Sequence, residues 1–318
     1  MQFFTKVDIK PFDKKIDHRA PILSLGSCFA DNIAKRLQRA KFTTTASPTG
    51  ILFNPESIAR AIERFARASH SEDTLPTANE LLQSNGLWYS YDFHSSLSHT
   101  NADTAFSQMC EAIMRGAEAL TTAEVVIITF GTAFVYRLNA SGEVVANCHK
   151  QPQKLFTRQM LSTEEIVKRY NTLLQGPLAD KRVIFTLSPV RHLGDGLEQN
   201  SLSKATLRVA LGEIVRANEN AEYFPSYEIM MDELRDYRFY TDDMTHPSPL
   251  AVQYIWQRFS ETFFTETTQK ACIERLKITQ MQQHRPSNTQ SKAYKQLQEK
   301  IATMLQNWEK NYLRAKPE

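Results

Sequence analysis

The stretch Pro21-Ile-Leu-Ser-Leu-Gly-Ser-Cys-Phe29 joins a short apolar run to a glycine turn and then to an amphipathic segment. Residues 21–25 predict a buried strand. Residues 29–39 predict a helix, because Phe29, Ile33 and Leu37 recur on one face while charged residues lie off it. A strand followed at once by a helix is the first half of the β–α alternation that characterises α/β proteins.

The same alternation continues along the chain. The runs Val125-Val-Ile-Ile-Thr-Phe130 and Arg182-Val-Ile-Phe-Thr-Leu187 are rich in β-branched residues, which is typical of strands covered on both faces. Hairpins are expected within residues 71–103 and over 134–147, and a last strand within 221–231. Helices are expected at residues 55–68, 104–120, 162–175, 201–217 and 249–264. These elements predict a mostly parallel sheet between two helical layers, a three-layer α/β/α fold with inserted hairpins.

The C-terminal region is polar and helix-prone from about residue 265. Residues 292–313 place Ile301, Leu305 and Trp308 on one stripe, which we expect to pack against the same chain. We therefore predict an α/β domain over residues 1–264 and a helical extension over 265–318.

The bulk composition is that of an ordinary globular protein. The 318 residues carry a formal net charge of +3, too small to indicate nucleic acid or a membrane surface as a partner. No run approaches the roughly 20 apolar residues of a membrane span, and the N-terminus lacks the apolar core of a secretory signal. The four cysteines show neither zinc-finger nor redox spacing. We expect a cytoplasmic protein with reduced thiols and no cofactor, of undetermined oligomeric state.

Three turns follow predicted parallel strands, where α/β proteins bind their ligands: residues 26–28, 131–133 and 188–192. Ser27 and Cys28 begin a helix, whose free N–H groups and dipole favour an anion. We expect the pKa of a cysteine placed there to be lowered, which makes the thiolate a usable nucleophile. The same N–H groups could hold the oxyanion of an acyl-transfer intermediate.

A nucleophile of this kind needs a base that a third group orients. Asp243-Met-Thr-His246 supplies both on one short loop before the last helix of the α/β domain. An aspartate three residues before a histidine can reach its Nδ1–H and leave Nε2 free to take a proton. The prediction is a site with Cys28 or Ser27 as nucleophile, His246 as base and Asp243 as its orienting group.

The run Leu25-Gly-Ser-Cys-Phe-Ala30 carries a family resemblance: it spells the signature of the GSCFA family, which is similar to the SGNH/GDSL hydrolase superfamily. Over roughly residues 20–265 the resemblance implies a flavodoxin-like sheet. Further matching stretches are residues 47–55, 129–136, 147–150, 188–192 and 241–247.

The chain departs from the superfamily pattern at two places. SGNH enzymes read Gly-Asp-Ser at the first turn with the third residue as nucleophile, a position held here by Cys28, so the pattern favours Cys28 over Ser27. They read Gly-x-Asn at the second turn, where this chain has Ala133, whose side chain cannot donate to an oxyanion. The oxyanion hole would then rest on backbone N–H groups of Cys28 and Gly50. Other possible donors are Thr132, Asn147 and His149.

Other polar loop residues have open roles. His94, His149 and His192 either contact substrate or are hydrogen-bonded loop histidines, and with Cys148 they form the ligand set of an alternative zinc site. Arg191 could clamp a carboxylate or phosphate of the substrate. The aromatic residues at 88, 89 and 91 either line the pocket mouth, which suits a sugar or aromatic acyl group, or form a minor core.

The function predicted from these patterns is an acyl-ester hydrolase or O-acyltransferase that works through a covalent acyl-enzyme. Its substrate would be an acylated glycan or a small metabolite. Two alternatives stay open. One is a degenerate SGNH-type fold that binds a ligand such as a glycan without chemistry, and the other is a zinc-dependent hydrolase that uses the loop histidines.

Overall fold

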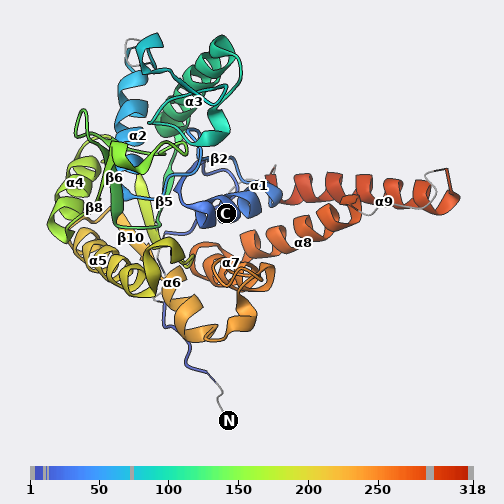
Figure 1. Ribbon diagram of the computed structural model, residues 1–318. Helices are drawn as coiled ribbons and strands as arrows, with labels where there is room; N and C mark the ends of the chain where they lie inside the picture. The colour runs from blue at the N-terminus through green and yellow to red at the C-terminus, as the bar shows by residue number, and fades with distance from the viewer. Residues whose placement is uncertain (1–3, 10–11, 13, 72–74, 284–289, 314–318) are drawn as a thin grey trace.

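The computed structural model describes residues 4–9, 12, 14–71, 75–283 and 290–313. In this part of the chain the central sheet has five parallel strands in the order β10–β9–β5–β1–β2 (Figure 1). Numbered along the chain this is the order 2-1-3-4-5, that of flavodoxin-like sheets. The three-layer α/β/α prediction is therefore confirmed. The strands are β1 (Ile22–Gly26), β2 (Thr44–Ala46), β5 (Val125–Phe130), β9 (Arg182–Leu187) and β10 (Ala221–Phe224).

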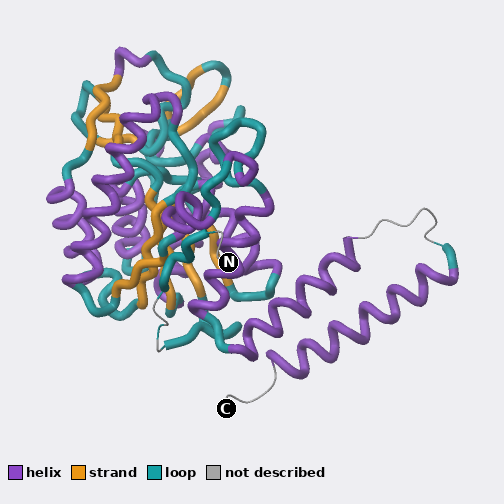
Figure 2. Tube along the Cα trace, turned by 90° about the horizontal axis from the view of Figure 1, so that it is seen from below, coloured by secondary structure: helices purple, strands orange, loops and turns teal. Residues whose placement is uncertain are grey.

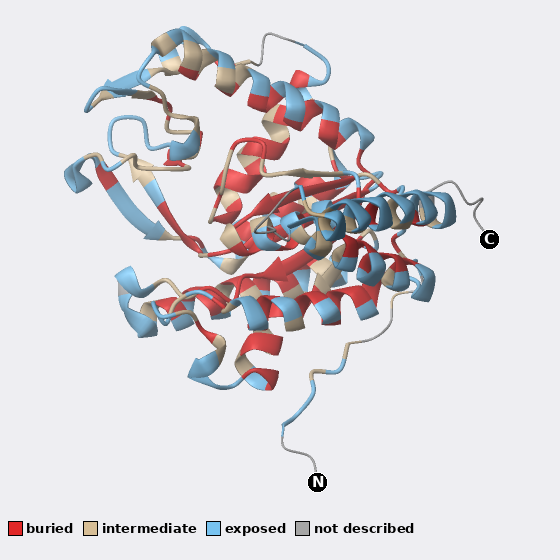
Figure 3. Cartoon of the chain, turned by 90° about the vertical axis from the view of Figure 1, so that its right-hand side faces the viewer, coloured by how far each residue is buried: buried red, intermediate tan, exposed pale blue. Residues whose placement is uncertain are grey.

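Side chains of the sheet alternate between two apolar clusters, one on each face. In β5, Val126, Ile128 and Phe130 belong to the first cluster, and Val125 and Ile127 belong to the second. Figure 3 shows the buried residues gathered on the sheet and on the inner sides of the helices. The first face is covered by α2 (Pro55–Ala68), α3 (Ala102–Thr122), α4 (Thr163–Gln175) and α5 (Gly196–Ala217), and the second by α1 (Cys28–Arg39) and α7 (Pro249–Phe263).

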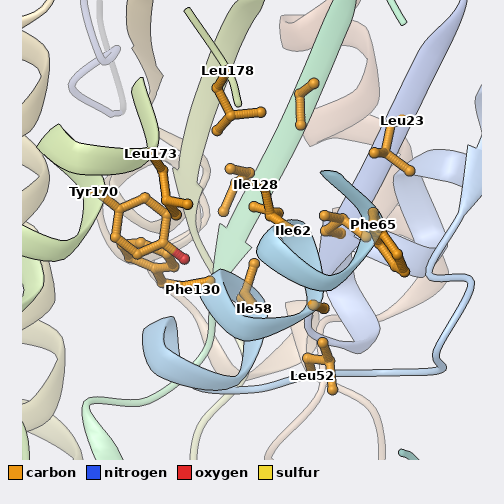
Figure 4. Packing of buried hydrophobic residues seen from close by; sticks show 14 of the residues in the cluster. Leu23, Leu52, Ile58, Ile62, Phe65, Ile128, Phe130, Tyr170, Leu173 and Leu178 are labelled. Atoms are coloured by element: carbon orange, nitrogen blue, oxygen red, sulfur yellow. The ribbon is translucent and has the colours of Figure 1, made fainter. Parts of the chain in front are cut away.

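Helix α2 illustrates how the sequence fixes these contacts. The Asn54 side chain accepts a hydrogen bond from the N–H of Ser57 at 2.8 Å and so caps the helix, and Pro55 occupies its first turn. Ile58 and Ile62 then lie on the face that meets the sheet, beside Ile128 of β5 (Figure 4). The spacing of four residues places both side chains on one side of the helix, as the sequence pattern predicts.

Two expected elements differ from their predictions. Helix α5 begins at Gly196 rather than Ser201. The strand expected over 221–231 ends at Phe224, and the chain continues as α6 (Ser226–Glu228) and a π-helix (Ile229–Glu233). Ile229 and Met230 bury their side chains in the second cluster from this helical segment, so their apolar character reflects packing against α7 rather than a place in the sheet.

The expected hairpins form two small antiparallel sheets outside the central one. Strands β3 (Leu82–Ser84) and β4 (Leu87–Tyr89) pair with each other, and β6 (Phe134–Leu138) pairs with β7 (Val144–Val145). The sequence did not reveal β8 (Phe156–Met160), which pairs with the other edge of β6. Most of its residues are exposed, so it carries no apolar run.

Helices α8 (Glu266–Gln283) and α9 (Lys292–Trp308) form a pair that projects from the α/β body (Figure 2). Ile301 and Trp308 are buried mainly against α8, and the Trp308 indole also meets the ring of His18 edge-on at 5.5 Å. The apolar stripe thus packs within the extension and touches the α/β body at its base. The division into residues 1–264 and 265–318 stays a prediction. None of the described helices is long and apolar enough to cross a membrane.

Candidate active site at the carboxyl edge of the sheet

The three predicted turns meet at the carboxyl edge of the sheet, around Gly131. A side-chain carbon added at Gly131 would lie 3.4 Å from the Cβ of Ser27, 3.5 Å from Nε2 of His192 and 2.9 Å from the carbonyl oxygen of Phe53. That carbonyl accepts hydrogen bonds from the N–H groups of Gly131 and Thr132 at 2.8 and 3.0 Å. Strands β1 and β5 are neighbours at the point where the strand order reverses, the usual ligand position in such sheets.

The first turn separates the two candidate nucleophiles. Gly26 has φ +133°, and a side chain there would stand 2.2 Å from the carbonyl oxygen of Thr129, so only glycine allows β1 to turn here. Ser27 is buried, and its Oγ caps α1 by accepting a hydrogen bond from the N–H of Phe29 at 3.3 Å. Cys28 is the first residue of the helix and only half-buried. Position therefore favours Cys28, while Ser27 has a structural task.

The expectation of a lowered pKa for Cys28 is wrong. Burial raises the pKa of its thiol, and this effect exceeds the lowering by the backbone N–H groups of Cys28 and Phe29. The charge of Lys204 also acts on the thiol in the lowering direction. The helix begins at Cys28 as the sequence predicts, but at this position desolvation outweighs the effect of the helix N-terminus on the pKa.

The candidate base His246 and the carboxylate expected to orient it lie in contact. His246 Nδ1 and Asp243 Oδ2 lie 2.7 Å apart. The other carboxylate oxygen of Asp243 accepts hydrogen bonds from the N–H groups of Thr245 and His246, at 2.8 and 3.0 Å, and from the Thr241 hydroxyl at 2.7 Å. These bonds hold the pKa of Asp243 far below its usual range, so the group stays a carboxylate. With hydrogen on Nδ1, Nε2 is the nitrogen that can accept a proton.

The loop that carries His246 is attached to the turn after β9. The N–H of Arg191 donates to the carbonyl oxygen of Thr245 at 3.1 Å. The Arg191 guanidinium lies over the ring of Tyr240, 4.1 Å from its centroid, and 5.1 Å from that of Tyr237. These residues border a cavity of about 130 Å³ beside the loop. A cation held on two aromatic rings is well placed for an anionic substrate group, and the clamp stays a prediction.

Most of the predicted oxyanion donors are already engaged. The N–H of Gly50 donates to the carbonyl oxygen of Ser47 at 2.8 Å, which corrects the expectation that it serves an oxyanion. Gly50 is needed instead for space, because a side chain there would lie 2.3 Å from Cβ of His94. The Thr132 hydroxyl pairs with that of Ser203 at 3.2 Å. Asn147 uses its oxygen Oδ1 to accept from the N–H of His149 at 2.7 Å, which does not engage its amide donors. Among the two backbone donors named from the sequence, the N–H of Cys28 at the start of α1 is the candidate for an oxyanion.

The three loop histidines have different surroundings. His149 Nε2 faces the carbonyl oxygens of Ser90 and Phe93 at 2.9 and 3.0 Å, and its ring stacks on Tyr89 with centroids 4.5 Å apart. A nitrogen between two carbonyls carries a hydrogen, so His149 is structural and the aromatic residues around it form a minor core. His94 Nδ1 accepts from the N–H of Ser96 at 3.2 Å and caps a short helix.

His192 is the loop histidine whose contacts place it at the three-turn junction, because its Nε2 lies next to Gly131. Its backbone N–H donates to Oδ1 of Asn200 in α5 at 3.0 Å. In the described part of the chain no three His, Cys, Asp or Glu side chains are grouped to hold a metal ion. Since His149 Nε2 is committed to two carbonyls, the predicted set of His94, Cys148, His149 and His192 does not fit zinc.

Sequence reasoning missed the buried face of α5, which supplies Ser203 and Lys204. The Ser203 hydroxyl accepts from the N–H of Ala133 at 2.8 Å. Lys204 is 2% exposed, and its Nζ donates to the carbonyl oxygens of Gly131 and Ser188 at 2.6 and 2.8 Å. A signal was present: Lys204 lies three and seven residues before Leu207 and Leu211, on the apolar face of the predicted helix.

Fold and site together define a flavodoxin-like α/β protein with a helix-N-terminal cysteine and a carboxylate-oriented histidine at the carboxyl edge of its sheet. A family model described as the GSCFA family matches residues 21–259, so the chain belongs to this family. A second model, described as the C-terminal domain of GSCFA domain proteins, matches residues 276–318. No match was found among the curated proteins.

Proposed function

We propose that this protein is an acyl-ester hydrolase or O-acyltransferase of the SGNH/GDSL type, with Cys28 as nucleophile and His246 as base. The observation that carries the proposal is the 2.7 Å contact between His246 Nδ1 and Asp243 Oδ2, on a loop tied to the turn after β9. A histidine oriented in this way is half of an acyl-transfer site. Cys28, at the start of α1, supplies the other half.

The proposed reaction has two steps. Cys28 Sγ forms a bond to the acyl carbonyl carbon, its proton passes to Nε2 of His246, and the ester C–O bond breaks as that proton moves to the leaving alcohol oxygen. Water or an acceptor alcohol then gives a proton to His246 and attacks the thioester, and the proton returns to the departing sulfur. The N–H of Cys28 stabilises the negative oxygen in both steps. A thioester transfers its acyl group readily to an alcohol, so O-acyltransferase activity stays part of the proposal beside hydrolysis.

The proposed substrate class rests on polar groups of the turn after β9, to which the loop of His246 is hydrogen-bonded. The Arg191 guanidinium on Tyr240 can bind a carboxylate or phosphate, and His192 can hydrogen-bond a hydroxyl. These groups suit an acylated glycan or a small acylated metabolite.

The test is turnover of short p-nitrophenyl esters by wild type and by Cys28→Ala, His246→Ala and Ser27→Ala. Both Cys28→Ala and His246→Ala are expected to lower kcat/KM by at least about a hundredfold. Ser27→Ala should keep more activity, because Ser27 only caps α1. His70→Ala, an exposed histidine at the end of α2, is the matched control. Full activity in both Cys28→Ala and His246→Ala refutes the proposal.

A second candidate is a ligand-binding protein without chemistry. It is favoured by the engaged N–H groups of Gly50 and Ala133 and by the raised pKa of Cys28, since a catalytic site needs free donors and a reactive thiol. A binder predicts no ester turnover, an inert Cys28 toward iodoacetamide, and retained binding of an acetylated glycan in the Cys28→Ala variant.

A further inference from the structure

A cleft lies between helix α2 and the two inserted hairpins, on residues that the candidate active site does not use. It consists of two adjoining cavities of about 460 and 240 Å³. The larger is bordered by α2, by the segment before β3 and by β7, and the smaller lies between the β3–β4 and β6–β7 hairpins. The residues common to both walls are Arg60, Glu80, Asp92, Glu143 and Val144. Cys28, Arg191 and His246 line neither cavity.

Ion pairs hold the shared wall in place. Arg60 Nη2 lies 2.9 Å from Asp92 Oδ1, and Arg64 Nη1 lies 3.3 Å from Asp92 Oδ2. Arg64 also donates two hydrogen bonds of 2.9 Å to the carboxylate of Glu80. These four side chains keep between 13% and 31% of their area exposed. They are therefore accessible from the cleft and already ordered before a ligand binds, which lowers the entropic cost of binding.

The charges of the cleft are compensated within the protein. A further carboxylate of the wall, Glu63, accepts hydrogen bonds from Arg169, one of them at 2.8 Å. The remaining charged groups of the wall, Arg67 and Glu143, are exposed and of opposite sign. A charged ligand would have to displace a partner from one of the ion pairs, which is unfavourable. A neutral hydroxyl group displaces none, because it can donate to a carboxylate lone pair and accept from a guanidinium N–H.

The smaller cavity has side chains that suit a sugar ring. Tyr91 is half-buried in its wall, together with the exposed Asn79 and Ser141. An aromatic ring offers an apolar surface to the C–H groups of a sugar, and amide and hydroxyl groups bond to its hydroxyls. The larger cavity has a volume within the range of small-molecule sites. Two adjoining cavities fit two linked rings better than one compact ligand.

We propose that this cleft is a binding site for a neutral oligosaccharide, with one sugar ring in each cavity and the Arg60–Asp92 pair between them. Arg60 and Asp92 bond to hydroxyls of both rings, and Tyr91 packs against the ring in the smaller cavity. The inference goes beyond the proposed function, because it uses none of the residues of the candidate active site and needs no acyl transfer. It also gives a role to the two hairpins outside the central sheet, since residues from both line the cleft.

The experiment is a saturation-transfer NMR titration of the full-length protein with four neutral disaccharides: maltose, cellobiose, lactose and N,N′-diacetylchitobiose. At least one should bind wild type with a Kd of about 1 mM or lower. Chitobiose and digalacturonic acid, which carry charges of opposite sign, should bind more weakly than the best neutral disaccharide. Failure of all four neutral probes to bind overturns the inference, and so does tighter binding of either charged probe.

Variants then locate the bound sugar. Asp92→Asn removes the carboxylate that two arginines share and should raise the Kd about tenfold, as expected for a lost hydrogen bond to a charged group. Asn79→Trp fills the smaller cavity from an exposed position and should weaken binding as much, even if Asp92→Asn does not fold. Glu222→Gln is the matched control, because Glu222 is a partly buried carboxylate that pairs with Arg182 at 2.7 Å outside both cavities. Wild-type binding by Asn79→Trp overturns the inference.

The variants Cys28→Ala and His246→Ala separate this inference from the proposed function. Both should bind the disaccharide as wild type does. Loss of binding in either would place the sugar at the candidate active site and overturn the inference. Sugar binding without ester turnover retains the cleft and rejects the proposed function, whereas ester turnover without sugar binding does the reverse.

Discussion

The free energy of unfolding should depend on pH through Lys204, and Lys204→Met should abolish that dependence. Burial lowers the pKa of Lys204 from its usual 10.5 to about 7 in the folded chain. Between about pH 7 and pH 9, the unfolded chain therefore carries one more proton at Lys204 than the folded chain. Stability rises with pH wherever the unfolded state binds more protons.

The magnitude follows from one proton. A difference of one bound proton changes the free energy of unfolding by about 1.4 kcal/mol per pH unit. The wild type should thus gain up to about 1.4 kcal/mol from Lys204 between pH 7.5 and 8.5. Other titrating groups contribute equally to wild type and variant, so the difference between the two slopes isolates Lys204. Above about pH 9 the unfolded cysteine also ionises, and the slope should flatten.

The assay is urea unfolding at pH 7.0, 7.5, 8.0, 8.5 and 9.0 with reductant present, for wild type, Lys204→Met and Lys181→Met. Lys181 is the control because it is also buried and donates to a carbonyl oxygen, that of Thr121 at 3.1 Å, but precedes β9 at the opposite end of the sheet. Lys204→Met should show the shallower rise with pH, and Lys181→Met should follow wild type. Equal slopes in wild type and Lys204→Met would refute the reasoning, because they would mean that Lys204 has the same pKa in both states. The absolute stability of Lys204→Met does not enter this test, although it leaves two carbonyls without a donor.

Three further outcomes are expected. Asp243→Asn keeps an oxygen for the three donors of its loop but presents an amide N–H₂ to His246 Nδ1. Ester turnover should therefore fall at least about a hundredfold, with little change in melting temperature. Unchanged turnover would contradict the role of Asp243. Gly131→Ala places a carbon 2.9 Å from the Phe53 carbonyl oxygen and should destabilise by about 1–3 kcal/mol in thermal unfolding, whereas the control Gly194→Ala meets nothing within 4 Å. Trp308→Phe loses the 2.8 Å hydrogen bond from the indole N–H to the carbonyl oxygen of Ala271. Limited proteolysis of α9 should therefore become faster, while the alkylation of Cys28 by iodoacetamide stays unchanged. Altered alkylation would show that the helical extension acts on the site.

The sequence predicted the central sheet because its strands are covered on both faces and so appear as continuous apolar runs. The apolar run of residues 125–130 predicts a buried strand from its composition alone, without information on its tertiary contacts. Strand β8 escaped notice for the opposite reason, since its exposed side chains leave it without such a run. The dyad of Asp243 and His246 was predictable because a contact over three residues is local.

The sequence alone did not predict how burial and local structure combine to set the pKa of Cys28 and the availability of hydrogen-bond donors at the site. The start of α1 lowers the pKa of Cys28 in any such turn, but how far desolvation reverses this depends on packing from distant parts of the chain. The Gly50 N–H is likewise engaged because Gly50 adopts φ +84° in a turn, where its N–H donates to the carbonyl oxygen of Ser47. Lys204 joins two turns that lie far from it in sequence, and only the folded sheet edge brings them together.

The two departures from the SGNH pattern have a common physical consequence. An oxygen nucleophile needs a base at the moment of attack and a strong oxyanion hole, because an alkoxide is far less stable than a thiolate. A thiolate formed in advance reduces the demand for both. The absence of an asparagine donor at Ala133 is then compatible with the proposed acyl transfer if Cys28 is ionised when it attacks. A Cys28 that reacts with iodoacetamide therefore favours the enzyme, and an inert Cys28 favours the binder, before any substrate is known.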